Sequence, residues 1–279
     1  MRRTLPPGSD TFVVSRETYT HGHAAPVLRS HSWRTAANSA GYLLPRLDPA
    51  DRLLDVGAGP GTISIDLAGR LASGFVEAVD SAPAAVAAGT RAAAESGLDR
   101  IRFSVGDVYA LDFADDSFDV SHAHQVLQHL ADPVAALREM RRVTRPGGLV
   151  AVRDADYASM TWFPDAPGLD RWQSIYRQVA KAMGGEPDAG RRLKEWVLQA
   201  GFTELTCSAS VWCFADADDL AWWSETWAER ITGSDLAEHA RDLGVPAAEL
   251  AELGRVWRSW AGRPGAWFAV LHGEVLAVA

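Results

Sequence analysis

The sequence contains little cysteine. Its 279 residues include two, Cys207 and Cys213. If both lie on one strand, their spacing of six residues separates them by roughly 20 Å, which is too far for a disulfide. We therefore expect two small, buried, apolar side chains in a reducing compartment.

Long apolar runs are also missing. Nowhere does the sequence approach the roughly 18 consecutive apolar residues of a membrane helix. Arg2 and Arg3 open the chain without the apolar stretch that follows such residues in a signal peptide. Both absences predict a cytoplasmic protein without a membrane partner.

Acidic residues outnumber basic ones. The chain has 27 Lys and Arg against 36 Asp and Glu, which gives a formal net charge of −9. Nucleic-acid-binding proteins usually gather basic side chains on one face. We therefore expect no nucleic-acid partner and favour a small, neutral or cationic substrate. A homo-oligomer is compatible with this composition.

What the chain does contain is a large apolar fraction, 47%, enough for one large α/β domain or two small ones. Between residues 51 and 153, short β-rich segments alternate with helical ones. This alternation predicts a parallel sheet wound by right-handed crossovers. The expected strands are 52–56, 75–79, 101–105, 118–123 and 149–153, and the expected helices are 61–71, 83–96 and 133–143.

The composition changes after residue 155, beyond which 10 of the 11 tryptophans lie. We interpret residues 1–50, helical from about 26 to 47, as an N-terminal cap, serving either as a lid or as a surface helix. Residues 51–279 form the second predicted unit, one domain with helical insertions at about 155–189 and 215–265 over the substrate site. Its later elements are predicted as helices 169–183, 190–200 and 216–260 and strands 201–214 and 266–278.

A glycine-rich turn follows the first predicted strand. Residues 53–68 read LLDVGAGPGTISIDLA, with glycines at 57, 59 and 61 and Asp55 two positions before the first. A dinucleotide-binding turn needs G-x-G-x-x-G, and Thr62 stands where its third glycine belongs. The spacing therefore disfavours an NAD-dependent oxidoreductase. A turn of purely structural purpose is the simpler alternative.

The pattern D-x-G-x-G-x-G resembles motif I of the class I S-adenosylmethionine-dependent methyltransferases. Further motifs of that family have counterparts, in order, within residues 51–153. They are 76–80 (VEAVD), 104–108 (SVGDV), 122–130 (HAHQVLQHL, similar to the ubiquinone/menaquinone-biosynthesis type) and 141–149 (RRVTRPGGL). The resemblance implies a doubly wound, Rossmann-like, seven-stranded and mostly parallel sheet with an N-terminal helical cap and helical insertions. It also implies S-adenosylmethionine as the cofactor.

The resemblance assigns cofactor contacts residue by residue. Asp55 would orient the methionine ammonium, directly or through water, and Asp80 would hold the ribose hydroxyls. Asp107 would accept from the adenine amine. The other implied contacts are Gly57, Ala58 and Gly59 along the turn, Ser81 beside the adenosine, Gly106 and Val108 beside the adenine, His124 and Gln125 at the methionine, and Arg34 at its carboxylate.

Methyl transfer from a sulfonium is an in-line displacement, so positioning and exclusion of water matter most. An acceptor that must lose a proton needs a base, for which Tyr19 or His124 are the candidates. The candidate substrate-contacting residues are Tyr19, Tyr157, Trp222 and Trp223. Tryptophans at helical spacing, here Trp223 and Trp227, are also typical of a core. We expect no metal site, because no ligand pattern completes the histidine pairs.

The leading hypothesis is a methyltransferase acting on a small, hydrophobic or aromatic metabolite, at carbon, nitrogen or oxygen. Quinones and specialised metabolites such as indoles or terpenoids belong to this class. The alternatives are a macromolecule methyltransferase, which the acidic charge disfavours, and a non-catalytic S-adenosylmethionine-binding protein. The intact acidic positions predict cofactor binding in all three cases.

Overall fold

The computed structural model describes residues 33–279, and its centre is one eight-stranded sheet. The strand order is β3-β2-β1-β4-β5-β8-β6, with β7 pairing with β8 off this path. Neighbouring strands from β3 to β5 are parallel, and β8 is antiparallel to β5, β6 and β7. The strands are β1 (Arg52–Val56), β2 (Phe75–Asp80), β3 (Ile101–Val105), β4 (Phe118–His124), β5 (Thr144–Ala155), β6 (Thr161–Phe163), β7 (Leu205–Phe214) and β8 (Trp267–Val278).

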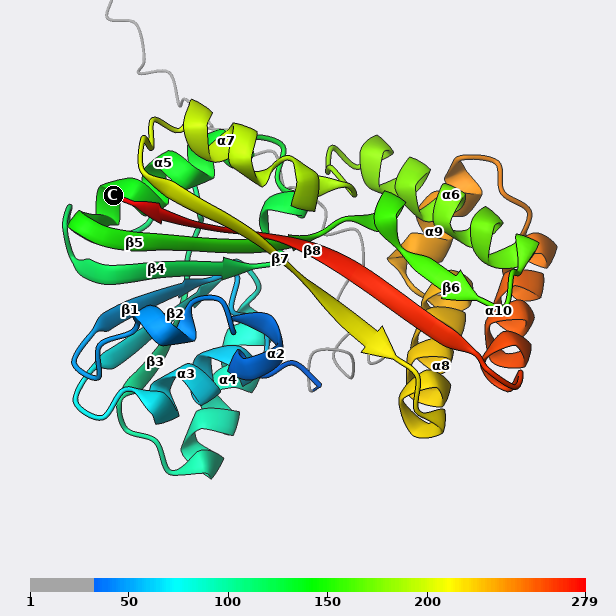
Figure 1. Cartoon of the computed structure of the whole chain (residues 1–279), viewed down its shortest axis with the longest axis horizontal. Helices are drawn as coiled ribbons and strands as arrows, with labels where there is room; N and C mark the ends of the chain where they lie inside the picture. The colour runs from blue at the N-terminus through cyan, green and yellow to red at the C-terminus, as the bar shows by residue number, and fades with distance from the viewer. Residues whose placement is uncertain (1–32) are drawn as a thin grey trace, which may run out of the picture.

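The helices divide into two groups (Figure 1). One group flanks the parallel part of the sheet: α2 (Ala36–Ser39), α3 (Thr62–Arg70), α4 (Pro83–Ser96), α5 (Pro133–Val143) and α7 (Leu193–Gln199). The other group forms a separate helical lobe: α6 (Pro167–Ala182), α8 (Ala217–Gly233), α9 (Asp235–Asp242) and α10 (Ala247–Ala261). Short 3-10 turns are η1 (Leu44–Arg46), η2 (Leu127–His129), η3 (Tyr157–Ser159) and η4 (Ala189–Arg191). The long strands β7 and β8 cross from the sheet into the helical lobe.

The predicted mixed fold with a mostly parallel, Rossmann-like sheet is confirmed. The sheet has one strand more than expected, because the three residues of β6 pair with the far end of β8. Local sequence explains why the helices begin where they do. Asp132, for example, caps α5 by accepting from the backbone N–H of Ala135 at 2.9 Å, and Pro133 takes the first helical position. Apolar residues of α5 then pack against the sheet.

The helical lobe has an aromatic core. Trp172, Trp227 and Trp257 are fully buried, and the ring centroids of Trp172 lie 4.5 and 4.8 Å from those of the other two. Edge-to-face contacts at such distances add to the stabilisation that burial provides. The tryptophan-rich segments therefore build a hydrophobic core of their own, beside the sheet.

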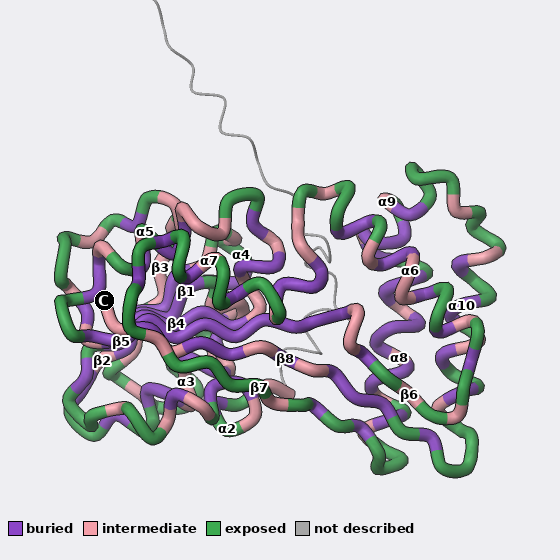
Figure 2. The backbone as a smooth tube through the Cα atoms, turned by 45° about the horizontal axis from the view of Figure 1, so that its top comes forward, coloured by how far each residue is buried: buried purple, intermediate pink, exposed green. Residues whose placement is uncertain are grey.

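Two expectations about local structure are wrong. Cys207 and Cys213 are exposed, because they share the face of β7 on which alternate residues from 207 to 213 lie open to solvent (Figure 2). The expected helix from 26 to 47 is, in its described part, only α2 and the short turn η1. Tyr19 and the rest of the proposed lid up to residue 32 lie outside the described residues. Within residues 33–279, no helix is long and apolar enough to cross a membrane.

Candidate functional site

The glycine turn after β1 is held in a conformation that only glycine adopts easily. Gly57, Gly59 and Gly61 have φ values of 68°, 57° and 84°. A Cβ added to Gly57 would lie 2.4 Å from Cγ2 of Val126, which follows β4. The backbone N–H groups of Gly57 and Ala58 donate to the carbonyl of Val79 at 2.8 and 3.0 Å. The turn thus presents bare backbone at the edge of the sheet.

Asp80, at the end of β2, is oriented by this turn. Its Oδ2 accepts from the backbone N–H of Gly59 at 2.8 Å, and its Oδ1 accepts from that of Ala82 at 2.9 Å. The side chain is half-buried, and a carboxylate oxygen can accept more than one hydrogen bond. Asp80 is therefore fixed in place yet able to accept from two hydroxyl groups. Ser81 beside it is exposed.

The turn after β3 lies next to Asp80, because the backbone N–H of Gly106 donates to the Asp80 carbonyl at 3.1 Å. A Cβ on Gly106 would lie 2.7 Å from Val79. Asp107 is exposed, and its Oδ1 accepts from the backbone N–H of Tyr109 at 2.9 Å. Val108 is half-buried. The structure thus brings the predicted ribose and adenine residues to one edge of the sheet.

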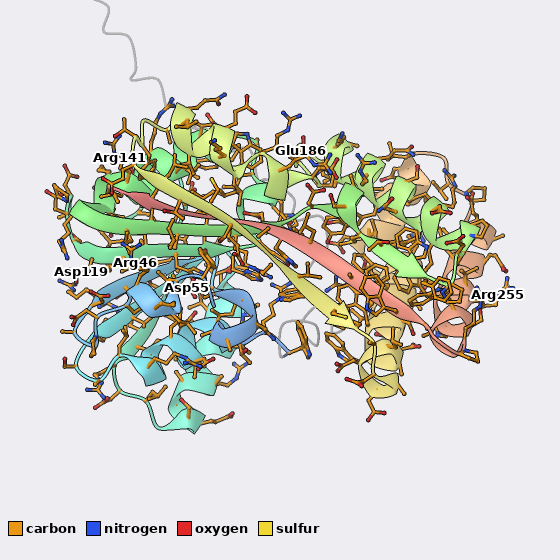
Figure 3. All side chains as sticks on the ribbon, viewed as in Figure 1. Arg46, Asp55, Asp119, Arg141, Glu186 and Arg255 are labelled. Carbon is orange, nitrogen blue, oxygen red and sulfur yellow. The ribbon has the colours of Figure 1, made fainter. Side chains whose placement is uncertain are left out.

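Asp55 is more deeply buried than Asp80 and Asp107. It is buried near the end of β1, two residues before the first glycine of the turn (Figure 3). Its Oδ1 is bonded to Nδ1 of His122 at 2.7 Å, and its Oδ2 accepts from the hydroxyl of Ser64 on α3. Both oxygens already have protein partners, so this carboxylate anchors the turn to β4 and α3. Its predicted contact with the methionine ammonium, directly or through water, stays a prediction.

Gln125 connects three distant parts of the chain. Its amide Nε2 donates to Nε2 of His272 on β8 at 2.8 Å, and its Oε1 accepts from Nη2 of Arg34 at 2.7 Å. His272 in turn donates from Nδ1 to the Val270 carbonyl at 3.1 Å, which leaves Nε2 as an acceptor. Burial, and then the charge of Arg153, hold the pKa of His272 well below 6.5, so the ring stays neutral.

The backbone of Gln125 is also strained. Gln125 has a φ of 54°, a left-handed conformation that a non-glycine residue adopts at a cost of order 1–3 kcal/mol. Such strain persists only where surrounding bonds hold it, and it gathers at functional sites. The bonds to Arg34 and His272 provide that support.

His124, the other predicted residue after β4, is buried behind this network. Its Nδ1 is 3.4 Å from Nη1 of Arg153, and its ring centroid is 5.5 Å from that of Trp212. Burial, and then the charges of Arg153 and Arg34, hold the pKa of His124 well below 6.5. A buried ring with such a pKa is a weak proton acceptor. Its proposed role as a general base therefore has no geometric support.

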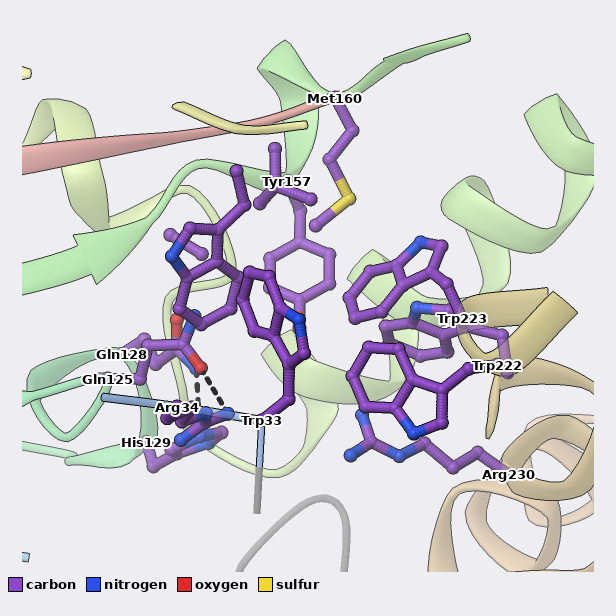
Figure 4. A pocket seen from close by; sticks show the side chains of 14 residues that line it. Trp33, Arg34, Gln125, Gln128, His129, Tyr157, Met160, Trp222, Trp223 and Arg230 are labelled. Carbon is purple, nitrogen blue, oxygen red and sulfur yellow. Dashed lines mark hydrogen bonds between the residues drawn. The ribbon is translucent and has the colours of Figure 1, made fainter. Parts of the chain in front are cut away.

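A small aromatic pocket lies between the sheet and the helical lobe, with a cavity volume of about 20 Å³ (Figure 4). It lies at the carboxyl ends of β4 and β5, where ligands bind in open α/β sheets. Its lining residues are Trp33, Arg34, Gln125, Gln128, His129, Ala155, Tyr157, Met160, Trp212, Trp222, Trp223, Trp227, Arg230 and Val270. Three predicted substrate residues, Tyr157, Trp222 and Trp223, thus meet the predicted cofactor residues Arg34 and Gln125.

The sequence did not point to several of these residues. Trp33, Trp212 and Met160 carry no motif, and Arg230 reads as an ordinary charged residue of a helix. His129 bonds to its neighbour in the chain, with its Nε2 2.9 Å from Nε2 of Gln128. It also lines the pocket.

Two basic side chains reach the pocket. Arg34 and Arg230 contribute guanidinium groups to its lining within residues 33–279. Burial, and then the charges of these two arginines, lower the pKa of His129 to about 3. His129 is therefore neutral at physiological pH.

Residues 47–201, more than half of the chain, match the family described as "Methyltransferase domain". The chain belongs to this family.

Relatives of this methyltransferase match about three quarters of the chain or more. An "uncharacterized methyltransferase" of Schizosaccharomyces pombe is 32% identical over 268 residues, which is 92% of this chain and 95% of the relative. A demethylmenaquinone methyltransferase of Beutenbergia cavernae is 33% identical over 213 residues, 74% of this chain and 79% of its own length. The family membership therefore extends beyond the sheet.

A solved structure shares the fold. The phosphoethanolamine N-methyltransferase 2 of Haemonchus contortus, in complex with phosphomonomethylethanolamine and S-adenosylhomocysteine, superposes with a TM-score of 0.53 at 18% identity. The match covers 85% of this chain and 51% of that one. The cofactor of this methyltransferase is S-adenosylmethionine. The bare glycine turn and the oriented Asp80 fit such a ligand, because they leave room for backbone contact and offer acceptors for a ribose.

Asp154, at the end of β5, gives the methyltransferase a pH-dependent stability. It is fully buried and accepts from the backbone N–H of Gln128 at 3.1 Å. Burial raises its pKa from 3.8 to about 8, against the lowering effect of that bond. A folded-state pKa above the unfolded one stabilises the fold below about pH 4, and this contribution is lost as the pH rises to about 8.

We expect the free energy of unfolding to fall between pH 4 and 8, by at most about 1.4 kcal/mol per pH unit from this group. Asp154→Asn keeps an acceptor and stays neutral, so its curve should be flatter. Urea unfolding across this pH range measures both slopes. Parallel curves for the two proteins would contradict the assignment.

Proposed function

We propose that this methyltransferase methylates a small, hydrophobic or aromatic metabolite, at carbon, nitrogen or oxygen. The observation that carries the proposal is the aromatic pocket, which shares Arg34 and Gln125 with the predicted methionine end of the cofactor site. An acceptor among the indole rings would lie beside the methyl group to be transferred. The 47–201 family match and the demethylmenaquinone methyltransferase relative support the same class.

Positioning is the main task of the side chains. Bound S-adenosylmethionine supplies an electrophilic methyl group on a sulfonium. In the proposal, the glycine turn and Asp80 hold the nucleoside, and Gln125 and Arg34 fix the methionine end. The pocket wall from Trp222, Trp223 and Tyr157 orients the acceptor and excludes water, which an in-line displacement requires.

The pocket offers weak proton acceptors. The pKa of His129 is about 3, and no lining residue is a carboxylate. Within the described part of the chain, the pocket therefore suits an acceptor that is already ionised or needs no deprotonation. A base role for Tyr19 stays a prediction, because this residue lies outside the described range.

Asp80→Ala tests the cofactor site. Removing the carboxylate should weaken S-adenosylmethionine binding by about 1–3 kcal/mol, because two ribose hydroxyls lose their acceptor. Titration calorimetry with S-adenosylmethionine, S-adenosylhomocysteine and NAD measures this. Asp99→Ala, an equal charge change at an exposed position, is the control and should bind like the parent. An unchanged affinity of Asp80→Ala would refute the ribose assignment.

A transfer assay tests the acceptor class. With labelled S-adenosylmethionine, we expect methylation of members of a panel of small phenols, naphthols and indoles. Label appearing only in protein or nucleic acid would favour a macromolecule methyltransferase, and tight binding without transfer to either class would favour a non-catalytic binder.

A further inference from the structure

We propose that His272 on β8 is a positioning residue of this methyltransferase, which fixes the end of the Gln125 amide that faces Arg34 and so strengthens binding of the methionine end of the cofactor. His272 belongs to none of the motifs and is 147 residues away from Gln125 in the sequence. The inference rests on the predicted cofactor contacts of Arg34 and Gln125. It is independent of the class of the methyl acceptor.

The amide of Gln125 has two ends of similar size and opposite function, since its oxygen accepts hydrogen bonds and its nitrogen donates them. In the structure, Oε1 lies 2.7 Å from Nη2 of Arg34 (Figure 4), and Nε2 lies 2.8 Å from Nε2 of His272. A guanidinium group can only donate. The reverse orientation of the amide would therefore set two donors against each other at Arg34.

His272 selects the same orientation from the other side. Its Nδ1 lies 3.1 Å from the Val270 carbonyl, which can only accept, so Nδ1 carries the proton. Burial, and then the charge of Arg153, hold the pKa of His272 well below 6.5, which keeps the ring neutral. A neutral imidazole with its proton on Nδ1 accepts at Nε2. His272 therefore binds the amide N–H of Gln125, and the amide oxygen faces Arg34.

The sheet holds the His272 ring in one place. On β8, His272 pairs with Ala155 of β5 on one side and with Ser210 of β7 on the other. The residue is fully buried, and its ring centroid lies 4.4 Å from that of Trp212 and 6.1 Å from that of His124. A side chain that is locked by packing can orient a neighbour precisely. His272 thus gives Gln125 an anchor inside the sheet.

Gln125 needs such an anchor because it lies just beyond the end of β4, with a φ of 54°. Its backbone N–H donates to the Arg153 carbonyl at 2.7 Å, which fixes the main chain but not the amide group. A guanidinium group has five N–H groups in a fixed plane, so Arg34 can bond to Gln125 and to a carboxylate together. An acceptor that is already oriented lowers the entropy that this binding costs.

Two substitutions of His272 separate its two hydrogen bonds. Asparagine reaches about as far as Nδ1 of histidine, so His272→Asn keeps a donor for the Val270 carbonyl and loses the acceptor for Gln125. Glutamine reaches about as far as Nε2, so His272→Gln keeps the acceptor for Gln125 and loses the donor. Each variant removes one bond from the same buried position, and each is the matched control of the other.

Calorimetry with two ligands gives the readout. S-adenosylhomocysteine carries the amino-acid end, whereas 5′-methylthioadenosine has the same nucleoside and sulfur without that end. In the full chain, His272→Asn should lower the affinity for S-adenosylhomocysteine about tenfold, because the amide of Gln125 loses its partner. His272→Gln should lower it less than about threefold, and both variants should bind 5′-methylthioadenosine within about twofold of the parent.

Equal losses for the two ligands would show that His272 is merely structural and would overturn the proposal. Equal losses of S-adenosylhomocysteine affinity in His272→Asn and His272→Gln, or no loss in His272→Asn, would overturn it as well. Gln125 is only half-buried, so Gln125→Met tests the same chain of contacts if the His272 variants do not fold. It should also lower only the affinity for S-adenosylhomocysteine about tenfold, and an unchanged affinity would refute the inference.

This inference and the proposed function fail separately. The titrations contain no methyl acceptor, so a wrong acceptor class would leave their results unchanged. Conversely, transfer to the panel of small aromatics by a chain whose His272→Asn variant binds S-adenosylhomocysteine like the parent would reject the role of His272 alone.

Discussion

Replacing Glu274 with glutamine should lower the free energy of unfolding by about 3–5 kcal/mol, because it leaves a buried cation without its counter-charge. The side chains of Arg153 and Glu274 are 1% and 6% exposed, with Nε and Oε1 3.2 Å apart. Ser208 and Ser210 donate to Glu274, and Arg153 also donates to Ser210. Burial already lowers the pKa of Arg153 to about 10, so the pairing is what keeps its charge tolerable.

Denaturant unfolding followed by circular dichroism measures the effect at neutral pH. The double variant Arg153→Met/Glu274→Leu is the informative control, because replacing both members of a buried pair by apolar residues is often neutral. It should be more stable than the single Glu274→Gln variant. A single variant within 1 kcal/mol of the parent would show that the pair is not required. A double variant less stable than the single one would show that the unpaired charge is not the cause of the loss.

Contacts between residues far apart in the sequence explain why the site could be only partly predicted. Motif positions such as Gly57, Gly59 and Asp80 act through local backbone geometry, and local spacing is what a sequence displays. The bond from Gln125 to His272 joins residues 147 apart. Nothing in the segment around His272 indicates that contact, which exists only because β8 returns along β5.

The burial of side chains on β7 was equally hard to predict from the sequence. Cys207 and Trp212 lie on the same strand, and its apolar pattern suggested burial for both cysteines. The cysteine face of β7 lies open to solvent, whereas Trp212 on the opposite face turns inward, where its Nε1 donates to the Asn38 carbonyl at 2.7 Å. Which face of a strand is covered depends on elements far away in sequence. The elements themselves were predicted well, since α4, α5 and β3 have the bounds that periodicity gave.

The sequence could not decide whether the tryptophans of α8 belong to the core or to a pocket, because helical spacing is typical of both a core and a pocket wall. The structure gives them both roles. Trp227 is fully buried, 4.5 Å from Trp172 between ring centroids, while Trp222 is half-buried and faces the pocket. One helix therefore links the stability of the lobe to the shape of the proposed acceptor site.

Trp227→Ala should accordingly lower the free energy of unfolding by about 3–5 kcal/mol, through lost burial and the cavity left behind. Trp222→Ala, the matched variant on the same helix, should cost only about 1 kcal/mol, yet weaken the binding of a naphthol from the transfer panel about tenfold, because it removes a stacking surface. Thermal and urea unfolding measure the first effect and calorimetry the second. Equal losses of stability in the two variants would mean that Trp222 is also core, and the pocket wall would then have to be assigned to Trp223 and Trp33 instead.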